Sequence, residues 1–213
     1  MKIAVIGAAG KAGSLIVKEA KERGHQVTAL VRDPSKFGEE GVQAVQKDVF
    51  ELTGEDVKGY DAVVNAISMP PGREDGHIEA GRKLIEAFQS APDTRLIVVG
   101  GAGSLFVDEA QTTRLIETPD FPDLYKPTAS SQGQNLKDLE ASSGIKWTFL
   151  SPAAFFDAEG KRTGAYRAAG DVLTVNAAGD SYISYEDYAI AIVDEIEKSE
   201  HVNERFSVVG EKE

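Results

Sequence analysis

Strand-like and helix-like stretches alternate along most of this chain, and that alternation restricts its fold more than any other feature. Residues 2–6 (KIAVI) form a short β-branched apolar run that Gly7 ends, and residues 11–23 carry Leu15, Ile16 and Ala20 at helical spacing. The same alternation predicts further strands at 25–31, 42–46, 61–67, 95–101 and 146–152, and further helices at 74–90 and 129–142. Repeated βαβ units predict an α/β fold, a parallel sheet with helices on both faces.

The segment from Arg162 onward has a different, mixed pattern. It predicts strands at 171–175, 182–184 and 205–209 and a helix at 185–198, in which Ser184 and Asp187 cap the first turn. We expect one domain over residues 1–213, in which the part from about residue 152 covers the substrate side. The acidic side chains Asp194, Glu195 and Glu197 are expected to be solvated surface.

Composition narrows the classes of partner. The chain has 213 residues, 41% of them hydrophobic, which suits a single sizeable core. Its formal charge of -12 disfavours nucleic acid and anionic membrane surfaces, and no segment reaches the roughly 20 apolar residues of a membrane helix. The absence of cysteine excludes thiolate chemistry and suits a reducing compartment. We expect a cytoplasmic protein without a signal peptide, either a monomer or a weak homodimer.

The first motif is the loop GAAGKAG, a G-x-x-G-x-x-G pattern directly between the first strand and the first helix. Glycines there allow close approach of a phosphate to the helix N-terminus, so the loop predicts dinucleotide binding. The alternative is a tight turn without a ligand, and for Lys11 an ordinary solvated lysine. The residues expected to hold the pyrophosphate are Gly7, Ala9, Gly10, Lys11, Ala12 and Gly13.

The second strand ends in ALVRDPSKF, where a carboxylate for the ribose 2′-hydroxyl would favour NAD. Arg32 instead offers a guanidinium suited to a 2′-phosphate, and Lys36 lies one turn further on. Asp33 precedes Pro34, so a turn or cap explains it better. This stretch favours NADP (NADPH) over NAD as the cofactor.

Two more strand ends belong at the same crevice of a parallel sheet. Asp48 and Val49 follow the third strand, and Ala66, Ile67 and Ser68 end the fourth. Asp48 alone could be a turn residue and Ser68 a loop hydroxyl, but both lie where the topology predicts a cofactor.

These motifs and several later ones resemble the atypical short-chain dehydrogenase/reductase-like NAD(P)H-binding (NmrA-like) family, including NADH-flavin reductases and the biliverdin reductase B group. The similar stretches are GAAGKAG, LVRDPSK, KDV, GGAGSL, IKWTFLSPAAFF, RTGAY and SYISYEDYAIAIVDEIE, which cover nearly the whole chain. The resemblance implies a Rossmann-like doubly wound parallel sheet flanked by helices, with a small mixed substrate-covering region at the C-terminal end. It also implies cofactor contacts at Gly100-Gly101, the nicotinamide near Pro152 and Ala153, and a hydride acceptor beneath Phe155, Phe156 and Tyr166.

The Tyr-x-x-x-Lys pair of ordinary short-chain dehydrogenases is absent, because no lysine has a tyrosine four residues before it. Tyr125 and Lys126 are adjacent and therefore point in different directions. By comparison with catalytic relatives, Thr128 and Gln132 occupy that register, and Gln132 can hydrogen-bond a ribose.

Two functions remain open from the sequence. The first is a reductase that passes hydride from NADPH to a small-molecule acceptor such as a flavin, which needs little acid catalysis from the protein. Ser104 is the one side chain named as a catalytic helper, although a loop or cap serine is the favoured interpretation. The second is a non-catalytic NADP(H)-binding sensor or regulator, and an epimerase or dehydratase is a distant third.

The histidines suggest no metal site. His25 precedes a strand, His201 lies in the tail, and His77 begins a helix near the mouth, where a loop or surface residue is expected. Without cysteine or paired histidines, metal binding is unsupported.

Overall fold

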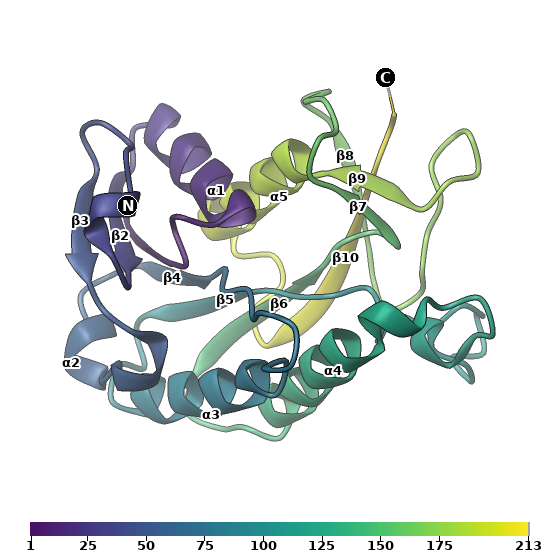
Figure 1. Cartoon of the computed structure of the whole chain (residues 1–213), viewed down its shortest axis with the longest axis horizontal. Helices are drawn as coiled ribbons and strands as arrows, with labels where there is room; N and C mark the ends of the chain where they lie inside the picture. The colour runs from purple at the N-terminus through teal and green to yellow at the C-terminus, as the bar shows by residue number, and fades with distance from the viewer. Residues whose placement is uncertain (213) are drawn as a thin grey trace.

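An eight-stranded sheet organises the chain, in the order β3-β2-β1-β4-β5-β6-β10-β8 (Figure 1). The structure is a computed structural model that describes residues 1–212. The first seven strands in this order, which end with β10, are all parallel to their neighbours. The last strand, β8, pairs antiparallel with β10. The sheet confirms the predicted α/β fold and its first six strands have the order of a dinucleotide-binding sheet.

The sequence positions of the elements follow the predicted alternation closely. The strands are β1 (Lys2–Ile6), β2 (Gln26–Val31), β3 (Gln43–Gln46), β4 (Ala62–Asn65), β5 (Arg95–Val99), β6 (Lys146–Ser151), β7 (Phe155–Asp157), β8 (Tyr166–Ala169), β9 (Tyr182–Ser184) and β10 (Glu204–Gly210). The α-helices are α1 (Lys11–Glu22), α2 (Gly54–Val57), α3 (Gly76–Gln89), α4 (Lys126–Glu140) and α5 (Tyr185–Lys198). Short 3₁₀ turns occur at η1 (Pro34–Lys36), η2 (Val49–Glu51), η3 (Leu115–Glu117) and η4 (Asp123–Tyr125).

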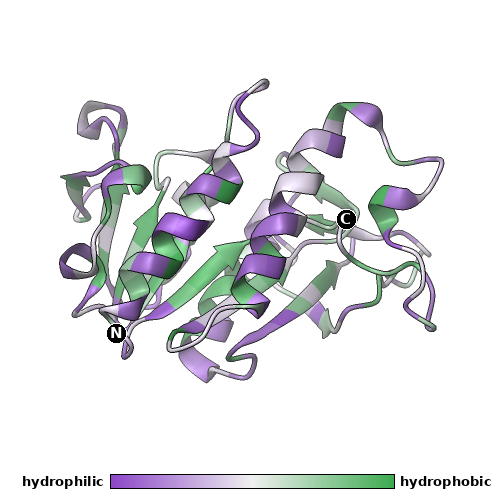
Figure 2. Cartoon of the chain, turned by 90° about the horizontal axis from the view of Figure 1, so that it is seen from below, coloured by the Kyte–Doolittle hydropathy of each residue, from purple (hydrophilic) through white to green (hydrophobic). Residues whose placement is uncertain are grey.

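Helices cover the sheet on both faces, α1 and α5 on one and α2, α3 and α4 on the other (Figure 1). Alternating side chains of each central strand enter opposite cores, so that Val5 packs with α1 and α5 while Ala4 and Ile6 pack with α3. The strands are hydrophobic along their length, whereas the helices turn hydrophilic residues outward (Figure 2). Burial on both faces explains why these strands read as apolar runs rather than as alternating patterns.

The strand order reverses between β1 and β4, which lie side by side at the middle of the sheet. β1 pairs with β2 on one side and with β4 on the other. In an open parallel sheet, the crevice at such a reversal is where ligands bind, beyond the carboxyl ends of the strands. The glycine-rich loop leaves β1 at this point.

The C-terminal part differs from the prediction by one strand that does not form and by two strands, β7 and β8, that were not predicted. The predicted strand at 171–175 is wrong, because only Val172 forms an isolated bridge, to Phe106 of the loop after β5. That segment is held by the loop, since the Phe106 N–H donates to the Asp171 carbonyl and the Leu173 N–H donates to the Phe106 carbonyl. The edge of the sheet is instead formed by β8, and β7 pairs with β9 in a separate two-stranded sheet.

The predicted cap of α5 is confirmed and has a second role. The Ser184 hydroxyl accepts a hydrogen bond of 3.1 Å from the Asp187 N–H. The Asp187 carboxylate is fully buried and accepts hydrogen bonds from the N–H groups of Thr163 and Gly164. It therefore ties the segment before β8 to the start of α5.

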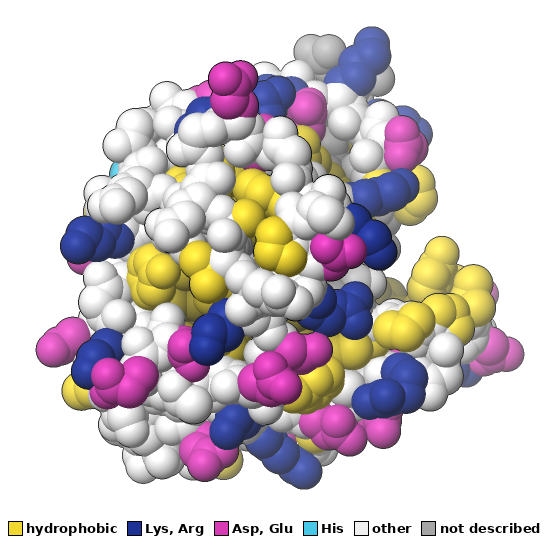
Figure 3. Space-filling model, turned by 60° about the vertical axis from the view of Figure 1, so that its left-hand side comes forward, with side chains coloured by type: hydrophobic (Ala, Val, Ile, Leu, Met, Phe, Trp, Pro, Cys, Tyr) yellow, Lys and Arg dark blue, Asp and Glu magenta, His cyan; other side chains and the backbone are white. Residues whose placement is uncertain are grey.

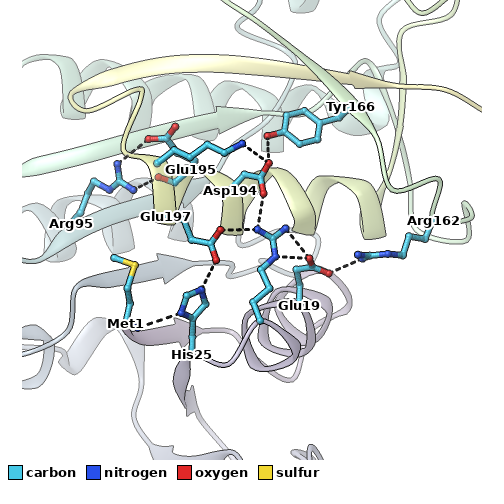
Figure 4. Close-up of polar contacts among 11 residues, drawn as sticks. Met1, Glu19, His25, Arg95, Arg162, Tyr166, Asp194, Glu195 and Glu197 are labelled. Carbon is cyan, nitrogen blue, oxygen red and sulfur yellow. Dashed lines mark hydrogen bonds and ion pairs between the residues drawn. The ribbon is translucent and has the colours of Figure 1, made fainter.

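The prediction of a solvated acidic face on α5 is wrong (Figure 4). The Glu195 side chain is 2% exposed and pairs with Arg95, which is 6% exposed, at 2.9 Å. Asp194 and Glu197 both pair with the Arg23 guanidinium at the end of α1, at 2.6 and 3.0 Å. The acidic side chains face α1 and the sheet because α5 packs against both, and basic residues far away in sequence compensate their charge.

Candidate functional site

The glycine-rich loop joins β1 to α1 as predicted, and two of its positions admit only glycine. Gly7 has a φ of +76°, and a Cβ on it would lie 2.7 Å from the Ala66 carbonyl oxygen. A Cβ on Gly13 would lie 2.3 Å from the Gly7 carbonyl oxygen. α1 therefore begins very close to the ends of β1 and β4, and its unpaired first-turn N–H groups suit an anion there.

A groove of about 630 Å³ opens at the carboxyl ends of β1 to β4, within the size range of roughly 300–1,000 Å³ of ligand sites. It is lined by Ile6, Gly7, Ala9, Gly10, Leu30, Val31, Arg32, Asp33, Lys36, Lys47, Asp48, Val49, Phe50, Ala66, Ile67, Ser68, Met69 and Pro70. A hollow of about 50 Å³ between α1 and α5 is too small for a nucleotide.

The groove brings together most of the cofactor residues that the sequence predicts. Those in its lining are Gly7, Ala9, Gly10, Arg32, Lys36, Asp48, Val49, Ala66, Ile67 and Ser68. The groove lining mixes apolar residues such as Ile6 and Leu30 with charged ones such as Arg32, which suits a nucleotide. The face in Figure 3 shows hydrophobic side chains in hollows, with acidic and basic side chains dispersed around them.

The carboxylates in the groove are already engaged in local caps. Asp33 accepts hydrogen bonds from the Ser35 N–H at 3.1 Å and the Ser35 hydroxyl at 2.6 Å, which lower the pKa of Asp33 and confirm the predicted cap. Asp48 accepts one of 3.0 Å from the Phe50 N–H at the start of η2. Arg32 is exposed and its guanidinium makes no hydrogen bond or ion pair within residues 1–212. The free charge at the end of β2 is therefore positive.

Lys11 lies at the start of α1, beside Ala12 and Gly13 and outside the lining of the groove. Its ammonium pairs with Glu159 at 3.2 Å, and the two side chains are 72% and 86% exposed. Such an exposed pair is weak, so Lys11 is free to reach a bound phosphate. Its predicted pyrophosphate contact stays a prediction.

The predicted nicotinamide residues lie at the carboxyl ends of β5 and β6. A Cβ on Gly101 would lie 2.1 Å from Gln132 Oε1, so the Gln132 side chain of α4 rests on the strand end. Pro152 and Ala153 are buried directly after β6. Gln132 is thus placed near the centre of the carboxyl edge, and its ribose contact stays a prediction.

Ser104 is buried in the loop after β5 and is already hydrogen-bonded. Its hydroxyl accepts from Arg205 Nη1 at 3.2 Å, and Arg205 Nε pairs with Asp171 at 2.5 Å. This contact supports the structural interpretation of Ser104, a loop serine held by an ion pair.

Of the three residues predicted beneath the acceptor, Phe155 points away from Phe156, while Phe156 and Tyr166 pack against the same core, and their contact with an acceptor stays a prediction. Phe155 is 55% exposed, whereas Phe156 packs against Tyr185 with ring centroids 3.9 Å apart. The two alternate because successive residues of a strand point to opposite faces. The Tyr166 hydroxyl donates to Asp194 at 2.9 Å, and burial together with this carboxylate raises the pKa of Tyr166 well above its ordinary value (Figure 4).

His77 is buried at the start of α3, which makes the prediction of a loop or surface histidine wrong. Burial lowers its pKa, and the nearby Glu74 opposes that shift. The loop before α3 folds back on the helix, as a Cβ on Gly76 would lie 2.7 Å from the Met69 sulfur. The first turn of α3 is covered for that reason.

The sequence reasoning missed several residues of the groove, above all Lys47, Phe50 and Met69. Lys47 directly precedes Asp48 at the end of β3, so its position at a strand end could have predicted that it lines the groove. Phe50 and Met69 lie in loops whose path the alternation of elements does not determine.

Residues 1–212 hold no cluster of three or more His, Asp or Glu side chains suited to a metal ion. None of the helices in this part of the chain has the length and apolar character to cross a membrane.

A strand reversal, a glycine-rich turn packed against it and a groove lined by three basic residues define a dinucleotide-binding α/β protein. Residues 7–199 match the model of the NAD(P)H-binding family, and the chain belongs to that family. A nicotinamide dinucleotide is therefore its ligand class.

Individual relatives extend the comparison over the whole chain. The uncharacterized protein YwnB of Bacillus subtilis (strain 168) is 64% identical over 213 residues, 100% of both chains. A crystal structure from Streptococcus pneumoniae TIGR4, described as a candidate NADH-flavin reductase, is 45% identical, with a TM-score of 0.92 over 99% of this chain and 100% of that one. The NAD(P)H azoreductase of Xenophilus azovorans is 26% identical over 98% of this chain and 68% of its own length.

Proposed function

We propose that this protein is an NADPH-dependent reductase that passes hydride to a flavin or a similar conjugated acceptor. The observation that carries the proposal is the groove at the β1/β4 reversal, where the glycine-rich loop lies beside basic side chains. When bound there, NADPH would supply the hydride. The protein would hold the two reactants together and exclude water from them.

The preference for NADPH over NADH rests on the end of β2. Arg32 is exposed at the groove without a partner in the described chain, and Lys36 is 78% exposed with only a 3.6 Å contact to Asp33. A 2′-phosphate would meet two available cations, whereas a ribose 2′-hydroxyl would find Asp33 already bound to Ser35.

Two residues of α4 favour a conjugated acceptor. Thr128 and Gln132 lie in the helix at the register where ordinary dehydrogenases have their tyrosine and lysine. A flavin accepts hydride at a ring nitrogen and takes its proton from solvent, so a protein acid is not needed. The descriptions of the streptococcal and Xenophilus relatives, flavin reductase and azoreductase, both concern conjugated acceptors.

The second candidate function is a non-catalytic NADP(H) sensor. It is favoured by the hydroxyl of Tyr166, the one phenol among the residues predicted beneath the acceptor, because that hydroxyl donates to Asp194 at 2.9 Å. The Tyr166 proton is held by this carboxylate, and burial together with Asp194 raises the pKa of Tyr166, so Tyr166 is a poor proton donor to a bound acceptor.

The discriminating experiment measures NADPH and NADH oxidation with FMN, riboflavin, biliverdin, a small quinone and an azo dye. Turnover of at least one acceptor, faster with NADPH, is the expected result. Micromolar NADPH binding by calorimetry without turnover of any acceptor would instead establish the sensor.

Cofactor choice is tested separately with Arg32→Ala. Because the guanidinium meets only the 2′-phosphate, NADPH affinity should fall about tenfold or more while NADH affinity stays within a small factor. Equal weakening of both cofactors would contradict the assignment of Arg32.

A further inference from the structure

Lys47 is a third basic residue in the groove, and it differs from Arg32 and Lys36 in being held in place. Its N–H donates to the Val31 carbonyl at 2.9 Å, and Gln46 Nε2 donates to the Arg32 carbonyl at 3.2 Å. The end of β3 is thereby fixed beside the end of β2. Lys47 and Arg32 line the same groove from these neighbouring strand ends.

The ammonium of Lys47 is oriented by a carboxylate of α2. Lys47 Nζ lies 2.6 Å from Asp56 Oδ1, while Asp56 Oδ2 accepts hydrogen bonds from the Thr53 N–H at 2.9 Å and the Thr53 hydroxyl at 2.8 Å. The Lys47 and Asp56 side chains are 35% and 19% exposed. The Lys47 ammonium has three N–H donors and Asp56 is its one partner among the described residues, so donors remain for a phosphate. Because the ammonium is already held in position, it loses less conformational entropy on meeting a phosphate than an exposed lysine does.

We propose that Lys47 is a third cationic contact of the 2′-phosphate of NADPH, preorganised by Asp56, and that it determines cofactor preference together with Arg32. The proposal rests on the NADPH preference proposed above. Two other roles are open to Lys47: its ion pair with Asp56 could serve only to hold α2 in place, or its aliphatic part could pack on the adenine. In either case, loss of Lys47 would change the affinities for NADPH and NADH equally.

The test uses 2′,5′-ADP and 5′-AMP as probes, because they differ only by the 2′-phosphate and require no turnover. Calorimetry compares the wild-type protein with Lys47→Met, which keeps the apolar stem and removes the charge, and with Lys47→Arg, which restores a charge. Lys58→Met is the matched control, since Lys58 pairs with Glu55 at the same helix but does not line the groove.

Lys47→Met should raise the Kd of 2′,5′-ADP about tenfold and leave that of 5′-AMP within about twofold. Lys47→Arg should keep most of the preference, and Lys58→Met should change neither Kd. Circular dichroism and thermal unfolding confirm that each variant is folded, and Lys47→Gln replaces the methionine variant if that one is not.

An unchanged preference in folded Lys47→Met, or equal weakening of both probes, would overturn the role of Lys47. If the wild-type protein itself binds the two probes equally, the proposed NADPH preference fails instead. The two failures are thus distinguishable within one set of titrations.

Discussion

Replacing Glu195 by alanine should be among the most destabilising single changes in this protein. Glu195 Oε1 accepts from Arg95 Nη1 at 2.9 Å and from the His201 N–H at 3.1 Å, and Oε2 lies 2.8 Å from His201 Nδ1. The Arg95 Nη2 group also donates to the Glu195 backbone carbonyl. Truncation leaves the Arg95 guanidinium, 6% exposed, without its counter-charge. Breaking such a buried pair costs about 3–5 kcal/mol.

That loss is large against a total stability of about 5–15 kcal/mol and corresponds to a fall in Tm of roughly 6–20 °C for a chain of this size. Chemical denaturation at neutral pH measures the free energy of unfolding directly. NADPH affinity of the folded fraction should be unchanged, because Arg95 is the first residue of β5. It therefore lies at the amino ends of the strands, whereas the groove lies at their carboxyl ends.

Glu197→Ala is the matched control on the same helix. Glu197 is 33% exposed and pairs with Arg23 and His25, so its loss should cost about 1 kcal/mol or less. The double variant Arg95→Met with Glu195→Leu should recover most of the stability, since apolar residues of similar volume replace the buried charges. A cost for Glu195→Ala no larger than that of Glu197→Ala would refute the buried pair.

Three further predictions concern the groove and its surroundings. Gly13→Ala should cost about 1–3 kcal/mol and weaken NADPH binding, because its Cβ would lie 2.3 Å from the Gly7 carbonyl oxygen; denaturation and calorimetry measure both effects. His77 has a pKa below its ordinary 6.5 in the folded protein, so its contribution is present above that pH and lost as pH falls through the folded pKa. His77→Gln should therefore flatten the stability profile below about pH 6.5, and an unchanged profile would contradict this. Tyr125→Phe and Lys126→Met should leave acceptor turnover within about twofold, since a hydride acceptor protonated by solvent does not use them; a collapse with intact NADPH binding would contradict this.

The fold and the nucleotide end of the site were predictable because both depend on local signals that the parallel sheet brings together. Apolar runs defined the central strands, and Gly7 and Gly13 marked the one turn that must pack tightly against them. Once the strands are parallel, their carboxyl ends share an edge, so Arg32, Asp48 and Ser68 meet without any information about side-chain contacts.

The errors have a common cause in contacts between distant segments. Glu195 is surface-like by its sequence neighbours, yet Arg95, 100 residues away, makes it a buried ion-pair partner. The stretch 171–175 has strand composition, but Arg205 and the loop at Phe106 hold Asp171 and its neighbours outside the sheet. Nothing in either local pattern reports the distant partner that determines its environment.

The charges at the groove explain how a protein with a net negative charge can bind an anionic dinucleotide. The chain carries a net charge of -12, which would repel NADPH if all its charges acted equally. Charges more than about 8–10 Å away are largely screened at physiological salt, so the groove's own side chains dominate. There the carboxylates of Asp33 and Asp48 accept hydrogen bonds from backbone N–H groups. Arg32 and Lys36 also line the groove, where their charges can meet an anionic ligand. Three acidic residues of α5 are paired with arginines outside the groove: Asp194 and Glu197 with Arg23 at the end of α1, and Glu195 with Arg95 at the start of β5. The charges without a close partner at the groove are thus basic, which suits the anionic dinucleotide that this family binds.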